Sequence, residues 1–156
     1  MHPLATLVWD GLEFRTPAML RLVEALDEDE FRWRPPNRGN SVAWQVWHIA
    51  EVEDNWVRAL LHEEPKRYPF GCSVRTASPA QYPDKATLLA YFLDTRQLSR
   101  ARLEATGAAD FERTVRDAHY GELTVAQVWA GVVTSFAWHA GQIAQTSRML
   151  GRPATV

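Results

Sequence analysis

Two histidines lie in the middle of apolar helical patterns that are far apart in the chain. His48 falls within residues 41–51, and His139 falls within residues 134–143. An imidazole on the buried face of a helix needs a partner, because burying an unpaired polar group costs about 1–3 kcal/mol. Two such side chains on two helices of one small domain can share a partner. A divalent metal ion is the obvious candidate.

Ser135 occupies the position one helical turn before His139, where a third metal ligand would be expected. A catalytic zinc-type site takes three protein ligands and keeps one position open for water or a substrate. A neutral hydroxyl is a poor ligand, so the two histidines alone leave the site incomplete. Glu51, Asn55 or Gln142 could complete a weak site. Otherwise the site has lost its metal, and the imidazoles bond to each other, to Ser135, or through water.

The last helical pattern places polar side chains on a face that also carries core valines. At about 100° per residue, Ser135, His139 and Gln142 fall on this one face. Trp138 directly precedes His139 and is expected to help line a pocket beside it. We therefore expect this face to supply one wall of a binding site.

A second polar and aromatic line runs along the helical pattern that contains His48. Trp44, His48 and Asn55 share this face, and Glu51 lies close enough to bend round to it. Glu51 could also accept a hydrogen bond from an imidazole N–H. If the two lines oppose each other in the fold, they form an apolar pocket with a few converging polar groups. That is the usual composition of a small-ligand site.

The same residues also have purely structural explanations. A lone interior histidine in an apolar helix is more often a hydrogen-bonded core residue than a metal ligand, and tryptophans at helical spacing are more often core residues. The acidic run from Glu51 to Asp54 most simply forms a solvated face. Cys72 lies in a proline-rich loop without a cation at fixed helical spacing, so it is not predicted to be a nucleophile.

Four long helical patterns must position these side chains. Breakers and capping signals separate them, and Pro17 predicts a kink in the first. A long segment broken by prolines joins the second and third patterns. It predicts a crossover that sets these two helices parallel in a four-helix bundle. The expected helices are residues 4–25, 40–62, 84–107 and 124–151, with capping boxes at 27–30 and 124–127, and a short extended pair within 111–123.

Composition narrows the class of protein. A chain of 156 residues is most simply one domain, spanning 1–156, and it can bury a core without disulfides. The formal charge of −2 gives no electrostatic reason to expect nucleic acid as a partner. No apolar stretch reaches the length of a membrane span. The lone Cys72 fits a reducing cytoplasm, so we expect a cytoplasmic protein.

The segment 32–50, which reads RWRPPNRGNSVAWQVWHIA, together with HAGQI at 139–143, resembles the DinB/YfiT-like superfamily of metalloenzymes. The resemblance covers nearly the whole chain. It implies an all-α four-helix bundle of up-down-down-up topology, a homodimer, and a histidine-rich site for a divalent metal such as zinc or nickel. Characterised relatives depend on a low-molecular-weight thiol, and they include S-transferases and an isomerase.

Carried over residue by residue, the resemblance makes His48 the metal ligand of the second helix and His139 the second histidine of a pair in the fourth. Ser135 stands where the first of that pair is expected. The leading hypothesis is therefore a metal-dependent transferase or hydrolase that acts on a small molecule. The alternative is a metal-free binding or stress-response protein that has lost a ligand at Ser135. A third hypothesis is a purely structural dimer module.

Overall fold

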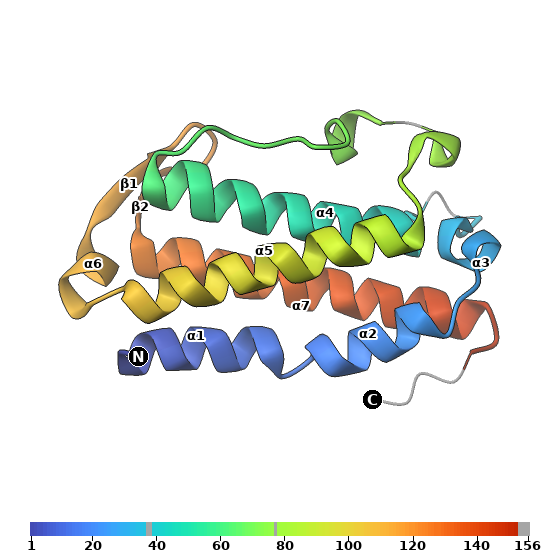
Figure 1. Cartoon of the computed structure of the whole chain (residues 1–156), viewed down its shortest axis with the longest axis horizontal. Helices are drawn as coiled ribbons and strands as arrows, with labels where there is room; N and C mark the ends of the chain where they lie inside the picture. Colours follow the sequence, from blue (N-terminus) through green and yellow to red (C-terminus); the bar gives the residue numbers. More distant parts are fainter. Residues whose placement is uncertain (37–38, 77, 153–156) are drawn as a thin grey trace.

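Helices running in two directions build the molecule, which is described by a computed structural model covering residues 1–36, 39–76 and 78–152. Figure 1 shows α1 and α2 running one way, α4 and α5 both returning, and α7 running forward again. The up-down-down-up four-helix bundle is thereby confirmed. The elements are α1 (Pro3–Glu13), α2 (Thr16–Glu24), α3 (Glu28–Arg32), α4 (Val42–Asn55), η1 (Trp56–Leu61), η2 (Ser73–Arg75), η3 (Pro79–Gln81), α5 (Lys85–Ala105), α6 (Ala108–Glu112), β1 (Thr114–Asp117), β2 (Gly121–Thr124) and α7 (Val125–Met149).

Two helices, α1 and α2, form the first side of the bundle, so the prediction of a single kinked helix is wrong. The chain breaks at Arg15, and Pro17 lies in the first turn of α2. Proline is tolerated there because the first turn of a helix leaves its N–H groups without intrahelical acceptors. The hydroxyl of Thr16 donates to the carbonyl of Leu12 across the break, at 2.8 Å. The two segments thus stay nearly in line without a shared hydrogen-bond ladder.

Capping side chains start the other long helices where the sequence predicts. Ser41 accepts a hydrogen bond from the backbone N–H of Trp44, and Asp84 caps α5 in the same way. Thr124 and Gln127 form the predicted capping box at the start of α7. Such caps contribute about 1 kcal/mol each, because they satisfy N–H groups that the first helical turn leaves unpaired.

A π-helical segment, η1, directly follows the C-terminal end of α4. The wider turn begins at Trp56, whose indole packs against α7 at Gly131. A Cβ atom at Gly131 would lie only 2.5 Å from Cζ3 of Trp56. Glycine is therefore required for this close approach of the two helices. Single-turn π-helical insertions are frequently found beside functional sites.

The predicted extended pair is an antiparallel hairpin in which Thr114 pairs with Thr124. Its turn is held by Asp117, whose carboxylate accepts hydrogen bonds from the backbone N–H groups of His119 and Tyr120 at 2.8 and 2.9 Å. The end of β2 leads directly into α7, whereas the hairpin turn lies beside η1, where the rings of Trp56 and Tyr120 meet with centroids 5.8 Å apart (Figure 1).

The acidic run on α4 is buried, and the expected solvated face is wrong. Glu51, Glu53 and Asp54 are 5%, 2% and 0% exposed. Glu53 pairs with Arg96 of α5, with 3.2 Å between its Oε2 and Nη2, and accepts a 2.6 Å hydrogen bond from Ser99. Burial of a carboxylate requires such partners, which only the packed neighbouring helix supplies.

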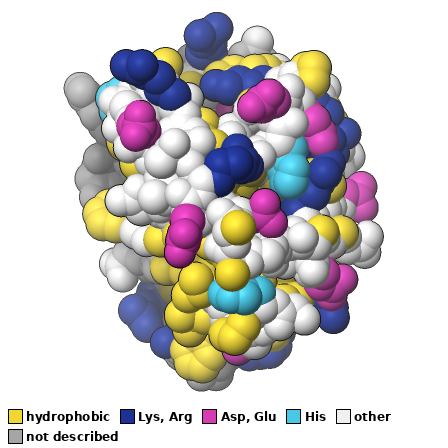
Figure 2. Space-filling model, turned by 90° about the vertical axis from the view of Figure 1, so that its left-hand side faces the viewer, with side chains coloured by type: hydrophobic (Ala, Val, Ile, Leu, Met, Phe, Trp, Pro, Cys, Tyr) yellow, Lys and Arg dark blue, Asp and Glu magenta, His cyan; other side chains and the backbone are white. Residues whose placement is uncertain are grey.

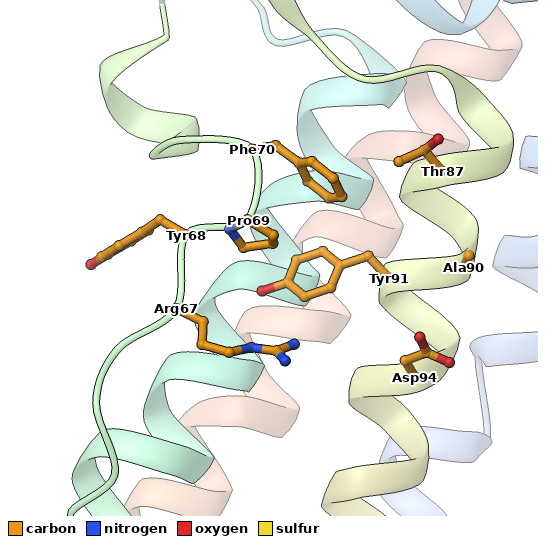
Figure 3. Close-up of a pocket in the computed structure, with 8 residues that line it drawn as sticks. All are labelled: Arg67, Tyr68, Pro69, Phe70, Thr87, Ala90, Tyr91 and Asp94. Carbon is orange, nitrogen blue, oxygen red and sulfur yellow. The ribbon is translucent and has the colours of Figure 1, made fainter.

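Asp54 ties the crossover segment to the bundle. Its carboxylate accepts hydrogen bonds from Arg58 on η1, from Arg67 on the crossover and from the hydroxyl of Tyr91 on α5, at 2.6, 3.1 and 3.0 Å. Figure 3 shows Arg67 and Phe70 of the crossover beside Tyr91, around a surface pocket of about 560 Å³. Two polar groups of this pocket, the Arg67 guanidinium and the Tyr91 hydroxyl, bind Asp54, so this part of its wall anchors the crossover.

None of the helices in the described part of the chain is long and apolar enough to cross a membrane.

Candidate metal centre

The imidazoles of His48 and His139 meet between α4 and α7. Their ring centroids are 5.0 Å apart, and the rings are nearly perpendicular at 79°. The indole of Trp44 stacks on His48 at 4.5 Å and presents its edge to His139 at 5.9 Å. Two histidines separated by about ninety residues of sequence thus share one aromatic wall, which restricts the orientation of both rings.

The crossover segment fixes the orientation of His48. Its Nδ1 lies 2.9 Å from the hydroxyl of Ser73, which in turn lies 3.0 Å from Oε1 of Glu51. The Ser73 backbone N–H donates to the other carboxylate oxygen of Glu51, at 2.9 Å. A carboxylate can only accept, so the Ser73 hydroxyl donates to Glu51 and its oxygen accepts from Nδ1–H of His48. This leaves Nε2 of His48 unprotonated.

A chain of two amides holds His139 in the same way. Nδ1 of His139 is hydrogen-bonded to Oε1 of Gln45 on α4, and Nε2 of Gln45 donates to Oε1 of Gln142 at 2.6 Å. An amide oxygen can only accept, so Nδ1 of His139 carries the proton. Nε2 of His139 is therefore also unprotonated. Gln45 is itself buried, at 2% exposure, so the amide chain has little freedom to reorient.

Both imidazoles are poor bases in this environment. Burial, together with the neighbouring His139, lowers the pKa of His48 to about 4, and burial lowers the pKa of His139 as well. The rings are therefore neutral at physiological pH. Among the described residues neither Nε2 has a hydrogen-bond partner. A neutral imidazole whose Nδ1–H is held by an oxygen acceptor is the usual form of a metal-ligating histidine.

A cavity of about 700 Å³ opens beside these two rings. We call it the histidine cavity. The β1–β2 hairpin and α7 form most of its wall, and none of the described residues that line it is lysine or arginine. Its lining comprises His48, Val52, Trp56, Asp117, His119, Tyr120, Leu123, Gln127, Gly131, Thr134, Ser135, Trp138 and His139. The cavity combines aromatic faces with two hydrogen-bond acceptors, so it suits a small neutral or cationic ligand.

The structure divides the residues predicted to form the pocket into two groups. Ser135 and Trp138 line the histidine cavity beside His139. Trp44 and Glu51 lie behind His48 instead, where the Trp44 indole N–H and the Glu51 carboxylate both bind Ser73. They orient the first histidine without bordering the cavity.

The remaining two predicted residues also lie away from the cavity wall. Gln142 bonds to Gln45 and so supports His139 from behind. Asn55 faces the crossover, where its amide exchanges hydrogen bonds of 3.0 and 2.7 Å with the backbone of Arg67. Asn55 therefore anchors the crossover and forms no hydrogen bond with either of the two imidazoles.

Three features of the site are not among those predicted from the sequence. Gln45 lies three residues before His48, which is helical spacing and could have indicated a contribution to the same face. Ser73 lies in a segment without periodicity, and no sequence signal identifies it as the partner of His48. The hairpin residues 117–123 enter the cavity wall only because the chain folds back there, so no local pattern predicts them.

The site contains two candidate metal ligands, His48 and His139. Across residues 1–36, 39–76 and 78–152, no three histidine, cysteine, aspartate or glutamate side chains lie close enough together to hold an ion. The unpartnered Nε2 atoms of His48 and His139 fit a metal as two of its ligands. The remaining positions would be completed by a solvent molecule or by a substrate, because Ser135 stands where the third ligand is predicted.

A family model for the DinB superfamily matches residues 12–143, which is most of the chain. The chain belongs to the DinB superfamily. Its fold is similar to that of a conserved protein from Enterococcus faecalis, with a TM-score of 0.79, 16% identity, and coverage of 94% of this chain and 97% of that one. It is also similar to YfiT from Bacillus subtilis, with a TM-score of 0.76, 18% identity, and coverage of 96% and 89%.

The YfiT structure is described as a probable metal-dependent hydrolase with an unusual four-helix bundle topology. A search of curated proteins finds no significant match. The comparisons thus establish the family and the fold, and the chemistry must be argued from the site.

Proposed function

We propose that this DinB-superfamily chain is a metal-dependent enzyme that acts on a small molecule in the histidine cavity. One observation carries the proposal: His48 and His139 are both held through Nδ1, and both leave Nε2 without a partner beside the same cavity. Both histidines are only partly buried, so solvent or a ligand in the cavity can reach these nitrogens. A cation that both imidazoles coordinate would use both free lone pairs at once.

The supporting hydrogen bonds match those of known metal sites. The oxygen that accepts Nδ1–H from a ligating histidine fixes the ring and increases its basicity toward the metal. Ser73 does this for His48 and Gln45 for His139. The likeness to YfiT, described as a probable metal-dependent hydrolase, supports the same assignment.

A divalent ion at this position would supply Lewis acidity, which activates a water or thiol nucleophile and polarises the substrate. The chain's own residues would bind and orient the substrate. Trp56, Tyr120 and Trp138 offer aromatic faces for its apolar part. The hydroxyl of Ser135, on the cavity wall beside His139, can donate a hydrogen bond to a substrate oxygen.

The finer assignment is an S-transferase that uses a low-molecular-weight thiol, with zinc or nickel as the metal. It rests on the family resemblance and on the two coordination positions that the protein leaves to other ligands. Hydrolysis differs only in the nucleophile, which is then water. The homodimer, the stress-response role and the cytoplasmic location stay predictions.

Metal titration tests the proposal. The protein is purified without chelator, analysed for its elements, and titrated with Zn²⁺ and Ni²⁺ by calorimetry. We expect one ion per chain with a Kd below about millimolar, because two fixed imidazoles bind a divalent ion with useful affinity. His48→Gln is expected to abolish this binding. His119→Gln, which removes another imidazole of the same cavity, is the matched control and is expected to bind normally. Binding that survives His48→Gln contradicts the proposal.

A second candidate function is favoured by Ser135 and by the two-ligand donor set. In it the chain is a metal-free binding protein, and a ligand N–H or O–H donor takes the place of the ion between the two Nε2 atoms. Thermal unfolding of chelator-treated protein with small amines and alcohols distinguishes the two candidates. A ligand specific for the folded state adds about 2.7 kcal/mol at a hundredfold excess over its Kd. A shift seen only when Zn²⁺ or Ni²⁺ is present favours the enzyme instead.

A further inference from the structure

A second pocket, of about 260 Å³, lies at the end of the bundle where η1 and α5 end and α7 begins. We call it the end pocket. Its floor is apolar and is formed by Leu61, Val125 and Trp129. Its rim carries His62, Arg102 and Arg113. Figure 2 faces this end of the molecule and shows lysine, arginine and histidine side chains beside one another, with acidic side chains between them.

The two arginines are held in place by groups that leave part of each guanidinium available. Arg102 is hydrogen-bonded to Glu64, and Arg58 binds the same carboxylate at 2.8 Å. Arg113 donates from Nη2 to the carbonyl of Leu61 at 2.7 Å. Each guanidinium has five N–H donors, and these bonds use only a minority of them. Both arginines are therefore positioned donors with spare capacity.

The charges around the end pocket do not cancel. Asp110 also lines it, but one of its oxygens already accepts from the backbone N–H of Gly107 at 2.8 Å. Glu64 is shared between Arg58 and Arg102. One carboxylate on the wall therefore faces two guanidinium groups. The N-terminus of the long helix α7, at Val125, adds the positive end of a helix dipole.

The nearby positive charges affect the imidazole of His62, on the rim of the end pocket. Burial and then the charge of Arg102 lower the pKa of His62, and Arg113 acts in the same direction. The ring is consequently neutral at physiological pH and can donate one hydrogen bond. The following residue, Glu63, has a left-handed backbone with φ of 56°. Glu63 directly follows the last turn of η1, where a left-handed residue commonly ends a helix, and this turn fixes the position of His62.

The floor contains a buried donor without an acceptor. Trp129 is 1% exposed, and its Nε1–H has no hydrogen-bond partner among the described residues. A buried N–H without an acceptor is energetically unfavourable. Trp129 also lines the end pocket, so a ligand bound there would alter the surroundings of this indole.

We propose that the end pocket binds a small organic carboxylate, with its charged group at Arg102 and Arg113 and its apolar body against Leu61 and Trp129. The planar guanidinium fork matches a carboxylate in geometry and charge. Inorganic phosphate would leave the apolar floor uncovered and would place a larger charge beside Asp110. The end pocket shares no lining residue with the histidine cavity, so this site is independent of the metal centre.

Benzoate is the probe, and calorimetry together with the ¹H–¹⁵N signal of the Trp129 indole is the measurement. The indole signal is assigned from Trp129→Phe. We expect saturable binding at millimolar benzoate and a shift of this one indole signal. Arg113→Gln and Arg102→Gln are each expected to weaken binding by about tenfold or more, because a hydrogen bond to a charged group contributes about 1.5–3 kcal/mol. Benzamide, the neutral isostere, should bind to the unmodified protein no more tightly than benzoate binds to the arginine variants.

Arg100→Gln is the matched control, because Arg100 lies on the same helix and pairs with the exposed Glu104 outside the pocket. It should bind benzoate normally. Arg113→Lys keeps the charge without the fork and should bind with intermediate affinity. Thermal melting shows whether each variant folds. If Arg102→Gln does not fold, Arg113→Gln alone tests the proposal. Equal binding of benzoate and benzamide, tighter binding of phosphate, or unchanged binding by both arginine variants would overturn the proposal.

Discussion

The histidine cavity and the end pocket both contain residues of η1 and of α7, but their chemistry is opposite. Trp56 and Leu61, the first and last residues of η1, belong to the histidine cavity and the end pocket respectively. On α7, Trp129 borders the end pocket and Gly131 borders the histidine cavity. Gln127, two residues before Trp129, also borders the histidine cavity, so an acceptor-rich site and a donor-rich one lie on different faces of the same stretch of α7.

The difference follows from how each side chain type responds to burial. An imidazole loses its proton when it is desolvated, as the pKa of about 4 for His48 illustrates. Buried histidines thereby become acceptors, which suit a metal ion. A guanidinium stays charged under any such condition, so the protein holds Arg102 beside Glu64 and near the surface. The arginines remain donors, which suit an anion.

The largest expected effect comes from completing the histidine cavity with Ser135→His. This change adds a third candidate ligand one turn before His139 and should increase Zn²⁺ affinity by more than about 100-fold, since catalytic zinc sites use three protein ligands. Calorimetry and competition with a chromophoric chelator measure the gain. Benzoate binding at the end pocket should stay the same. A variant that binds metal no better than the natural chain would show that the two imidazoles do not face a common ion.

Ser73→Ala tests whether the crossover orients His48. Removing the hydroxyl leaves Nδ1–H without its acceptor and deprives Glu51 of a donor, so metal affinity should fall about 10–100-fold. The free energy of unfolding should also fall by about 1–3 kcal/mol. Ser78→Ala, at an exposed serine of the same segment, is the control for both measurements. An unchanged metal Kd would mean that the ring of His48 is held by packing against Trp44 alone.

Gly131→Ala tests the contact that lies between the two sites. The new Cβ would lie 2.5 Å from Cζ3 of Trp56, so the variant should lose about 1–3 kcal/mol of stability through overpacking. Gly141→Ala adds the same atom to the same helix in open space. It should instead stabilise the protein by about 0.5–1 kcal/mol, because alanine is the better helix former. Denaturant unfolding of both variants measures the contrast, and equal effects would contradict the close packing of Trp56.

The smallest effect concerns the titration of His62. Arg102→Gln removes a positive neighbour, so the pKa of His62 should rise toward its ordinary value of 6.5. The folded-state pKa lies below the unfolded one, so acidification below about pH 6.5 favours unfolding through this group. The variant should weaken that dependence. NMR titration of the histidine signals measures the change, and His48, in the other site, should not move. A shift of both histidines would mean that the two sites are electrostatically coupled.

Local sequence determined the helix starts and the faces on which the histidines lie. Ser41, Asp84 and Thr124 cap their helices through hydrogen bonds that span three residues, so no distant contact is needed to predict them. The spacing within each helix likewise places His48 and His139 on apolar faces. Both features depend only on the 3.6-residue period and on adjacent side chains.

Tertiary packing decided what those faces meet. The acidic residues Glu53 and Asp54 look solvated in sequence, yet arginines from α5 and the crossover neutralise them in the core. Ser73 has no periodic signal, and only the course of the crossover brings it to His48. Hydrogen bonds and ion pairs act over a few ångströms of space. Their partners are therefore set by the path of the chain and not by distance along it.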